Sequence, residues 1–277
     1  MPVEPPDHHE PQRGLHPVEW SCELIGTALL LFGGLSAICL DFGPHAAIAA
    51  HVPSHSTRLL ITGLLFAAAG SLVAISPLGR RSGAHLNPAV TLAFWLRGNV
   101  HRHDLLGYTA SQIAGAVLGT LAVEGLWGHT ARVLSFGATV PGHGLDNVQA
   151  AGVETLMTAA LVLAILLMTS RAGTAPWTPL VVWIVVAALV WQGAAYTGTS
   201  LNPARSFGPA ILGHRLAVYW IYVAGPLAGA ALAAGLHEVL PGGRPVTAKL
   251  FHDPAYRSSL GGSLPVKGSE LAQASTK

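Results

Sequence analysis

The chain carries one seven-residue pattern twice, and this duplication constrains its fold more than any other feature. Gly83–Ala89 (GAHLNPA) matches Gly198–Ala204 (GTSLNPA), and each copy contains Asn-Pro-Ala. Upstream of each copy, a single carboxylate stands inside an apolar run, at Glu23 and at Glu154. The sequence therefore predicts two structurally related halves.

Six long apolar stretches surround these motifs, each close to the ~20 residues that cross a ~30 Å hydrocarbon core. Only 10% of the residues are charged, against about 25% in soluble domains. A net charge of +2 gives no support to nucleic-acid binding, and the two cysteines stand too far apart along one run for a disulfide. We expect an all-α integral membrane protein with transmembrane helices near 20–40, 58–78, 104–126, 150–170, 176–196 and 216–240.

Lysine and arginine are unevenly distributed between the two sides of this topology. Six spans place both termini on one side, which collects eleven of the fifteen Lys and Arg residues and leaves four on the other. The positive-inside rule then places both termini in the cytoplasm. We expect residues 1–17 to be a retained polar tail, 18–240 the membrane domain with halves at about 18–135 and 148–240, and 241–277 a poorly ordered cytoplasmic tail.

Each half has three spans, with its Asn-Pro-Ala segment between the second and the third. Because three crossings end on the side opposite to their start, the second half must be inverted. Residues 87–97 and 202–212 are apolar but only about eleven residues long, or ~16 Å as helix. Asn is a good N-cap and Pro a good first helical residue. The alternative, an ordinary Asn-Pro turn, does not explain two matched copies, so we expect two re-entrant half-helices that meet at the midplane.

These residues resemble the aquaporin or major intrinsic protein family. The segments Ser82–Thr91 and Thr197–Gly208 are similar to its two signature loops, with supporting matches at Gln112, Trp220 and Gly225. The resemblance covers about residues 18 to 240. It implies a passive channel of the bacterial type rather than an enzyme, with an aquaporin-like bundle, one pore per chain, a homotetrameric assembly and a place in the cell (inner or plasma) membrane. It implies no cofactor, and the partners are water, small neutral solutes and the lipid bilayer.

The resemblance also implies roles for individual residues. Asn87 and Asn202 would donate hydrogen bonds to a water at the pore centre, and Arg205 would line a constriction and repel cations. His85 is expected to line the pore, with simple packing as the alternative. The motif residues of the pore are Asn87, Pro88, Ala89, Asn202, Pro203 and Ala204.

The two carboxylates in apolar spans, Glu23 and Glu154, admit two interpretations. In the first they are structural and accept hydrogen bonds from the backbone of the re-entrant loops. In the second they carry protons for a coupled secondary transporter. The repeat symmetry and the absence of a neighbouring Lys or His in the sequence favour the structural interpretation.

The resemblance also implies a selectivity filter of Ala67, Val190, Thr199 and Arg205. Its positions in the second and fifth spans, Ala67 and Val190, are located by counting back from the two motif asparagines. Small residues at 67 and 190 predict a constriction wider than one water. Phe66 and Trp191 are immediate neighbours, and a one-residue shift turns a helix by 100° and can bring either into the pore.

The expected solute follows from conflicting signals. Ser206, Ala210 and the pair Tyr219–Trp220 resemble water channels, whereas the filter positions do not. We therefore expect a channel that conducts water, excludes protons and ions, and also passes small neutral solutes. The alternative is a broader facilitator for glycerol, urea or ammonia. The outer-loop histidines, which lack a tight metal-ligand spacing, give no prediction of a metal site: His45, His51, His55, His129 and His143.

Overall fold

The computed structural model describes residues 15–44, 46–142 and 144–240, and every regular element in these ranges is helical. The predicted tails, apart from residues 15–17, lie outside them. Six helical segments in the described ranges are long and apolar enough to cross a membrane: Pro17–Phe42, His55–Ile75, Arg102–Trp127, Asn147–Thr169, Ala175–Thr197 and Leu216–Val239. The predicted spans are confirmed, and their ends shift by three residues or fewer.

The spanning helices are α1 (Pro17–Phe42), α3 (His55–Ile75), α6 (Arg102–Trp127), α8 (Asn147–Thr169), α9 (Thr178–Thr197) and α11 (Ile221–Val239). Short elements that periodicity did not predict join them: α2 (Ala47–His51), α4 (Pro77–Ser82), α7 (His129–Val133), η1 (Ser135–Gly137), η2 (Ala175–Trp177) and η3 (Leu216–Val218).

Two half-length helices follow the duplicated motif. Helix α5 (Pro88–Leu96) has nine residues and α10 (Pro203–Leu212) has ten, or about 14–15 Å each. Asn87 caps α5 by accepting from the amide of Ala89, and Asn202 caps α10 by accepting from Ala204 and Arg205. The predicted N-caps are therefore present, and each half-helix begins at its Asn-Pro.

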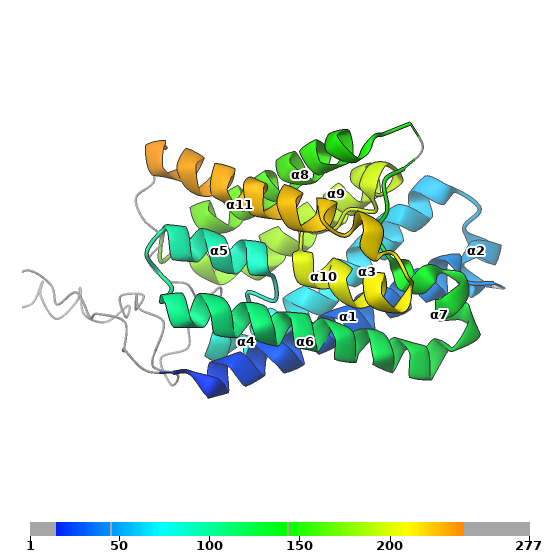
Figure 1. Cartoon of the computed structure of the whole chain (residues 1–277), viewed down its shortest axis with the longest axis horizontal. Helices are drawn as coiled ribbons and strands as arrows, with labels where there is room; N and C mark the ends of the chain where they lie inside the picture. Colours follow the sequence, from blue (N-terminus) through cyan, green and yellow to red (C-terminus); the bar gives the residue numbers. More distant parts are fainter. Residues whose placement is uncertain (1–14, 45, 143, 241–277) are drawn as a thin grey trace, which may run out of the picture.

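The helices run along the long axis of the molecule (Figure 1). Helix α1 begins and α11 ends at the same end of the bundle, as an even number of crossings requires. Within the first half α1 packs on α6, and within the second α8 packs on α11. Each half-helix packs against the last long helix of the other half, α5 on α11 and α10 on α6. The two halves are thus interlocked at the half-helices.

Glycines permit the two tight helix pairs. A Cβ at Gly115 would lie 2.2 Å from the Leu24 carbonyl oxygen on α1, and one at Gly229 would lie 2.4 Å from the Thr155 carbonyl oxygen on α8. In lipid, where apolar burial gives little driving force between helices, such close backbone packing replaces it. Gly119 and Gly225 make the matching contacts in their pairs, so each tight pair is lined by small residues.

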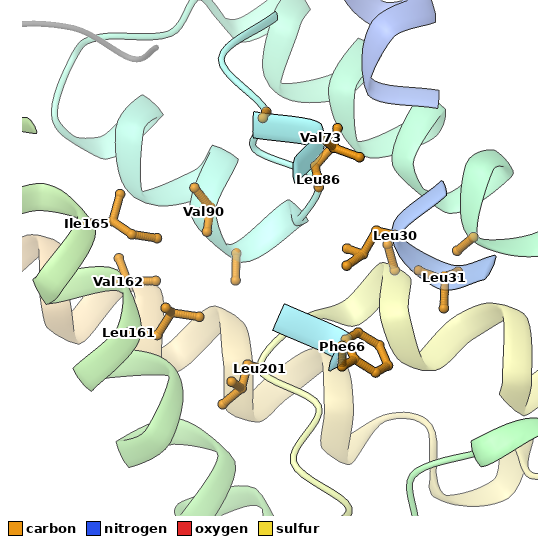
Figure 2. Close-up of a cluster of buried hydrophobic side chains, with 14 of the residues drawn as sticks. Leu30, Leu31, Phe66, Val73, Leu86, Val90, Leu161, Val162, Ile165 and Leu201 are labelled. Carbon is orange, nitrogen blue, oxygen red and sulfur yellow. The ribbon is translucent and has the colours of Figure 1, made fainter. Parts of the chain in front are cut away.

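The buried core lies around the ends of the half-helices. Figure 2 shows side chains from both halves gathered there, among them Leu30, Val90, Leu161 and Leu201. Phe66 of α3 belongs to the same cluster and is 9% exposed. This core holds the two Asn-Pro-Ala segments face to face.

Candidate pore and its constriction

The loops before the half-helices have an irregular backbone that repeats between the halves. Ala84 and Leu86 adopt φ of 50° and 49°, and the matching Thr199 and Leu201 adopt 49° and 58°. A non-glycine residue in this left-handed region costs roughly 1–2 kcal/mol. Both loops have this unfavourable backbone conformation at matching positions, so the surrounding structure must hold them firmly.

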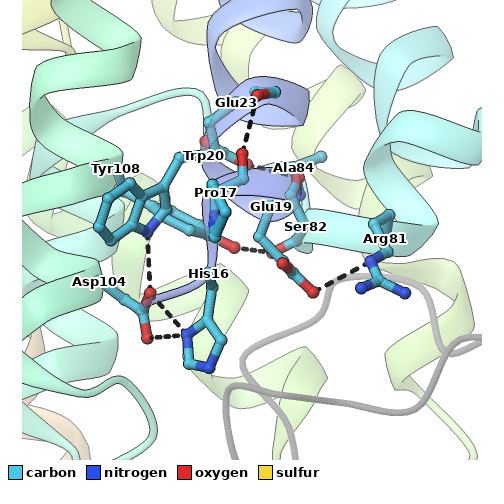
Figure 3. A network of polar contacts seen from close by, with 11 residues as sticks. His16, Pro17, Glu19, Trp20, Glu23, Arg81, Ser82, Ala84, Asp104 and Tyr108 are labelled. Atoms are coloured by element: carbon cyan, nitrogen blue, oxygen red, sulfur yellow. Dashed lines mark hydrogen bonds and ion pairs between the residues drawn. The ribbon is translucent and has the colours of Figure 1, made fainter. Parts of the chain in front are cut away.

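Glu23 holds the first loop from α1. Its carboxylate accepts from the backbone amides of His85 (3.0 Å) and Leu86 (2.7 Å) and from the Ser82 hydroxyl (2.6 Å). Gln112 of α6 donates to it as well, at 2.7 Å. Ser82 also accepts from the amide of Ala84, so it links the carboxylate to the loop (Figure 3).

Glu154 repeats this arrangement on α8. Its carboxylate accepts from the amides of Ser200 (2.8 Å) and Leu201 (2.9 Å) and from the hydroxyl of Thr197 (2.7 Å). Both carboxylates are fully buried and line neither of the two cavities described below. This is the geometry that the structural interpretation of Glu23 and Glu154 expects, and it gives the proton-carrier interpretation no support.

Two tyrosines complete the symmetry, and sequence analysis did not single them out. Tyr108 donates to the carbonyl of Ser82 at 2.6 Å, and Tyr222 donates to the carbonyl of Thr197 at 2.9 Å. Each lies on the last long helix of its half, as Figure 3 shows for Tyr108. Both are aromatic residues in apolar helices, so only their matching positions in the two halves could have singled them out in the sequence.

The two motif asparagines brace the loops against each other. Asn87 Nδ2 donates to the Leu201 carbonyl, and Asn202 Nδ2 donates to the Leu86 carbonyl, both at 2.8 Å. The Oδ1 atom of each accepts from its own half-helix. Because an amide nitrogen carries two hydrogens, one hydrogen of each asparagine is left for another acceptor.

Two cavities meet at the level of these loops. The wide cavity, about 330 Å³, reaches past the end of α1 and the start of α3 and includes Phe42, His55 and Val190. The narrow cavity, about 110 Å³, includes His85, Asn87 and Asn202. The residues that line both, and therefore form the boundary between them, are Phe66, Val186, Ser200, Leu201 and Arg205.

Arg205 and Phe66 face each other at this boundary. The guanidinium carbon of Arg205 lies 5.2 Å from the centroid of the Phe66 ring, within cation–π range. One guanidinium nitrogen donates to the carbonyl of Gly137 at 2.9 Å. Arg205 is 6% exposed and lies in the first turn of α10. The helix dipole disfavours a cation there, so the Gly137 carbonyl and the ring are what hold it.

The residue of α3 that contacts Arg205 is therefore Phe66. Of the two cavities, Ala67 lines the narrow one. Val190 and Thr199 line the wide cavity, as Arg205 does. Counting back from Asn87 gave Ala67, with Phe66 as the neighbour that a one-residue shift brings into the pore; the count crosses α4 and its turn, whose length the motif does not fix. Trp191 is 41% exposed, and its indole nitrogen donates to Ser56, away from this boundary.

His85 lies at the wall of the narrow cavity and is also packed. Its ring stacks on Phe94 at 4.9 Å between centroids and meets Tyr108 edge-on at 5.2 Å. Its Nδ1 lies 3.2 Å from the hydroxyl oxygen of Thr91. Both expectations for His85, lining and packing, describe part of this environment.

No cluster of three or more His, Cys, Asp or Glu residues that could hold a metal occurs among the described residues. Of the histidines considered above, His45 and His143 lie outside those residues. His55 faces the wide cavity and packs its ring 5.3 Å from that of Phe42.

Six spanning helices, two half-helices from inverted halves and a pair of cavities that meet between them define an α-helical membrane channel fold. Residues 18–237 match the sequence profile described as Major intrinsic protein. The chain belongs to the major intrinsic protein family, whose members are passive channels and not enzymes.

Relatives of two kinds resemble the chain over most of its length. A probable aquaporin AqpM from Archaeoglobus fulgidus is 33% identical over 80% of this chain and 96% of its own. The glycerol uptake facilitator protein-like 6 of Lactiplantibacillus plantarum is 33% identical over 80% of this chain and 97% of its own. The crystal structure of the aquaglyceroporin from Plasmodium falciparum superposes with a TM-score of 0.67 at 21% identity, covering 80% and 96% of the two chains. The predicted family and aquaporin-like fold are confirmed.

Proposed function

We propose that this channel conducts water together with small uncharged solutes of the size of glycerol or urea, and excludes ions and protons. The observation that carries the proposal is the constriction at Phe66 and Arg205, where the two cavities meet. It offers one cationic donor, one aromatic ring and otherwise small or aliphatic side chains.

The two asparagines supply the barrier to protons. Each has one amide hydrogen engaged with the opposite loop and a second one available to a water in the narrow cavity. The half-helix N-termini behind them carry about half a positive charge each. A water that accepts from both amides points its own hydrogens away along the pore, which interrupts proton hopping, and the positive potential repels cations.

We propose that Arg205 selects between cations and neutral solutes at the constriction. Its guanidinium is buried and always charged, so a passing cation must approach a like charge in a poorly solvated site. A neutral solute instead accepts a hydrogen bond from it. Phe66, whose ring lies against the guanidinium, narrows the opening beside it and gives carbon-bearing solutes an apolar surface.

The breadth of the solute range rests on the rest of the boundary. Val186 at the boundary and Val190 beside it in the wide cavity are aliphatic and compact, and neither offers a second donor beside Arg205. A water molecule gains little from such a wall, whereas a polyol can place its carbon backbone there. The relatives carry names of both kinds, aquaporin and glycerol uptake facilitator, in keeping with a mixed range.

We also propose the assembly and placement that the family resemblance implies. The chain forms a homotetramer with one pore per chain and lies in the cell membrane with both termini in the cytoplasm. The excess of Lys and Arg on that side supports the orientation. In this orientation the wide cavity opens to the outside and the narrow cavity lies toward the cytoplasm.

The experiment is an osmotic shock of proteoliposomes followed by light scattering, once with sucrose outside and once with glycerol. We expect fast shrinkage in sucrose and, in glycerol, fast shrinkage followed by fast re-swelling. A pH-sensitive dye inside the vesicles should report no proton flux during either.

Shrinkage without re-swelling would restrict the channel to water, with Phe66 as the narrowing residue. Neither response from folded protein would overturn the open-pore proposal. A proton flux that follows the solute would revive coupled transport.

A further inference from the structure

A buried carboxylate stands beside the wide cavity, outside the residues considered so far. Asp41 lies at the end of α1 and is fully buried. One guanidinium nitrogen of Arg58 donates to its backbone carbonyl at 3.1 Å, and the same guanidinium covers the Phe42 ring at 4.8 Å from its centroid. A charge withdrawn from water in this way is costly unless donors satisfy it.

The side-chain donor to this carboxylate is a hydroxyl on the neighbouring helix. Thr62 of α3 donates from Oγ1 to Asp41 Oδ2. The other carboxylate oxygen, Oδ1, has no hydrogen-bond partner among the described residues. The hydroxyl hydrogen of Thr62 is therefore held by a buried anion that has no other side-chain donor in the described part of the chain. It cannot turn toward the cavity without leaving that anion unsatisfied.

This fixed hydrogen determines what Thr62 offers to the cavity. A hydroxyl has one hydrogen and two lone pairs. With the hydrogen committed to Asp41, only acceptor capacity remains, and the bond to a charged group strengthens it. Thr62 lines the wide cavity, so it presents an acceptor to whatever enters.

Thr62 also stands in register with the constriction. It precedes Phe66 by four residues on α3, which places both on one helix face about 6 Å apart along the axis. Both line the wide cavity. A second hydroxyl there is committed in the same way, since Thr199 Oγ1 donates to the Leu189 carbonyl at 3.3 Å. The wall of the wide cavity therefore carries hydroxyl acceptors as well as the donor Arg205, and Thr62 lies one helical turn before Phe66, the residue that contacts Arg205.

We propose that Thr62, oriented by Asp41, is a solute-binding and specificity-determining residue of the wide cavity for polyols and amides. Such solutes carry donors and acceptors a few ångströms apart. Their O–H or N–H group donates to Thr62 and one of their oxygens accepts from Arg205. These two hydrogen bonds replace bonds to water that the solute gives up when it enters the wide cavity. Water, a single small molecule, gains less from the spaced pair. This inference rests on the proposed function and names its preferred solutes.

The test measures glycerol, urea and water permeability of proteoliposomes with Thr62→Val, Thr62→Ser, Asp41→Asn and the Thr62→Val/Asp41→Asn double variant. Thr62→Val keeps the shape and removes the hydroxyl. The double variant removes the anion that Thr62→Val leaves without its donor, so a folding defect is separated from a solute effect. Thr158→Val is the matched control, because Thr158 is fully buried, lines neither cavity and has no hydroxyl partner among the described residues.

We expect Thr62→Val and the double variant to lower glycerol and urea permeability about fivefold relative to water, the effect of one hydrogen bond. Thr62→Ser and Thr158→Val should keep the wild-type ratio. Asp41→Asn should lower the ratio in the wild-type background and leave it unchanged in the Thr62→Val background, because Asp41 acts through Thr62.

An unchanged ratio in Thr62→Val with normal water flow would overturn the proposal. So would an equal loss of water and solute flow in both Thr62→Val and the double variant, which would assign the pair a purely structural task. If the wild type itself passes neither glycerol nor urea, the broad-solute proposal fails first, and the variants are not needed to show it.

Discussion

The guanidinium of Arg205 lies over the ring of Phe66, 5.2 Å from its centroid, at the boundary between the two cavities. One residue comes from the first turn of the second half-helix and the other from the second spanning helix of the first half. The constriction is thus formed across the interface of the inverted halves, and no single half contains it.

Phe66→Ala should widen this constriction. Removing the ring that lies against Arg205 enlarges the opening beside the guanidinium, so glycerol permeability should rise about tenfold, or ~1.4 kcal/mol of barrier, with a smaller change for water. Trp191→Phe is the control, since its indole points to Ser56 and away from the boundary. Glycerol-driven re-swelling of proteoliposomes measures both. Equal changes in glycerol permeability in the two variants would contradict the placement of Phe66 at the constriction.

Arg205→Val should admit cations. The substitution removes a buried positive charge whose repulsion of a monovalent ion at ~4 Å is about 1–4 kcal/mol for effective dielectric constants of 80 to 20. A sodium leak measured with a sodium-sensitive dye should therefore rise about tenfold, while water still passes. The control is Arg132→Gln, because Arg132 pairs with Glu124 away from both cavities. This variant should leave the cation leak at the wild-type level.

Glu154→Gln should destabilise the second loop. The carboxylate accepts from two backbone amides and one hydroxyl, and an amide group turns one acceptor oxygen into a donor facing those donors. We expect a loss of about 2–3 kcal/mol and a lower thermal midpoint in detergent. Thr197→Val removes one neutral donor and should cost about 1 kcal/mol. A Glu154→Gln protein of wild-type stability would contradict the bracing role.

The spanning helices and the half-helices could be predicted from the sequence because both are determined by neighbouring residues along the chain. Length and apolarity set the spans, and the Asn-Pro caps set the starts of α5 and α10. The motif count was not sufficient for Phe66, since the turn at α4 intervenes. Asp41 and Thr62 were missed because they are 21 residues apart and only the packing of α1 on α3 brings them together.

Gly115→Ala should weaken the α1–α6 pair. The new Cβ would lie 2.2 Å from the Leu24 carbonyl oxygen, and overpacking of this kind typically costs about 1–3 kcal/mol. Gly152→Ala is the matched control, because a Cβ there meets no atom within 4 Å among the described residues and alanine favours helix by about 1 kcal/mol. Thermal unfolding should rank Gly152→Ala at or above wild type and Gly115→Ala below. The reverse order would contradict the packing account.

The most direct test of the pore is thiol block at a single position of α9. Val190 lines the wide cavity beside Arg205, whereas Ala188 lines neither cavity and is exposed on the helix surface. The native cysteines Cys22 and Cys39 are buried, so the wild type serves as the background. Mercuric ion should sharply reduce water permeability of proteoliposomes carrying Val190→Cys and leave Ala188→Cys and wild type unchanged. Equal inhibition of both variants, or none in Val190→Cys after confirmed labelling, would contradict a pore that passes Val190, Phe66 and Arg205.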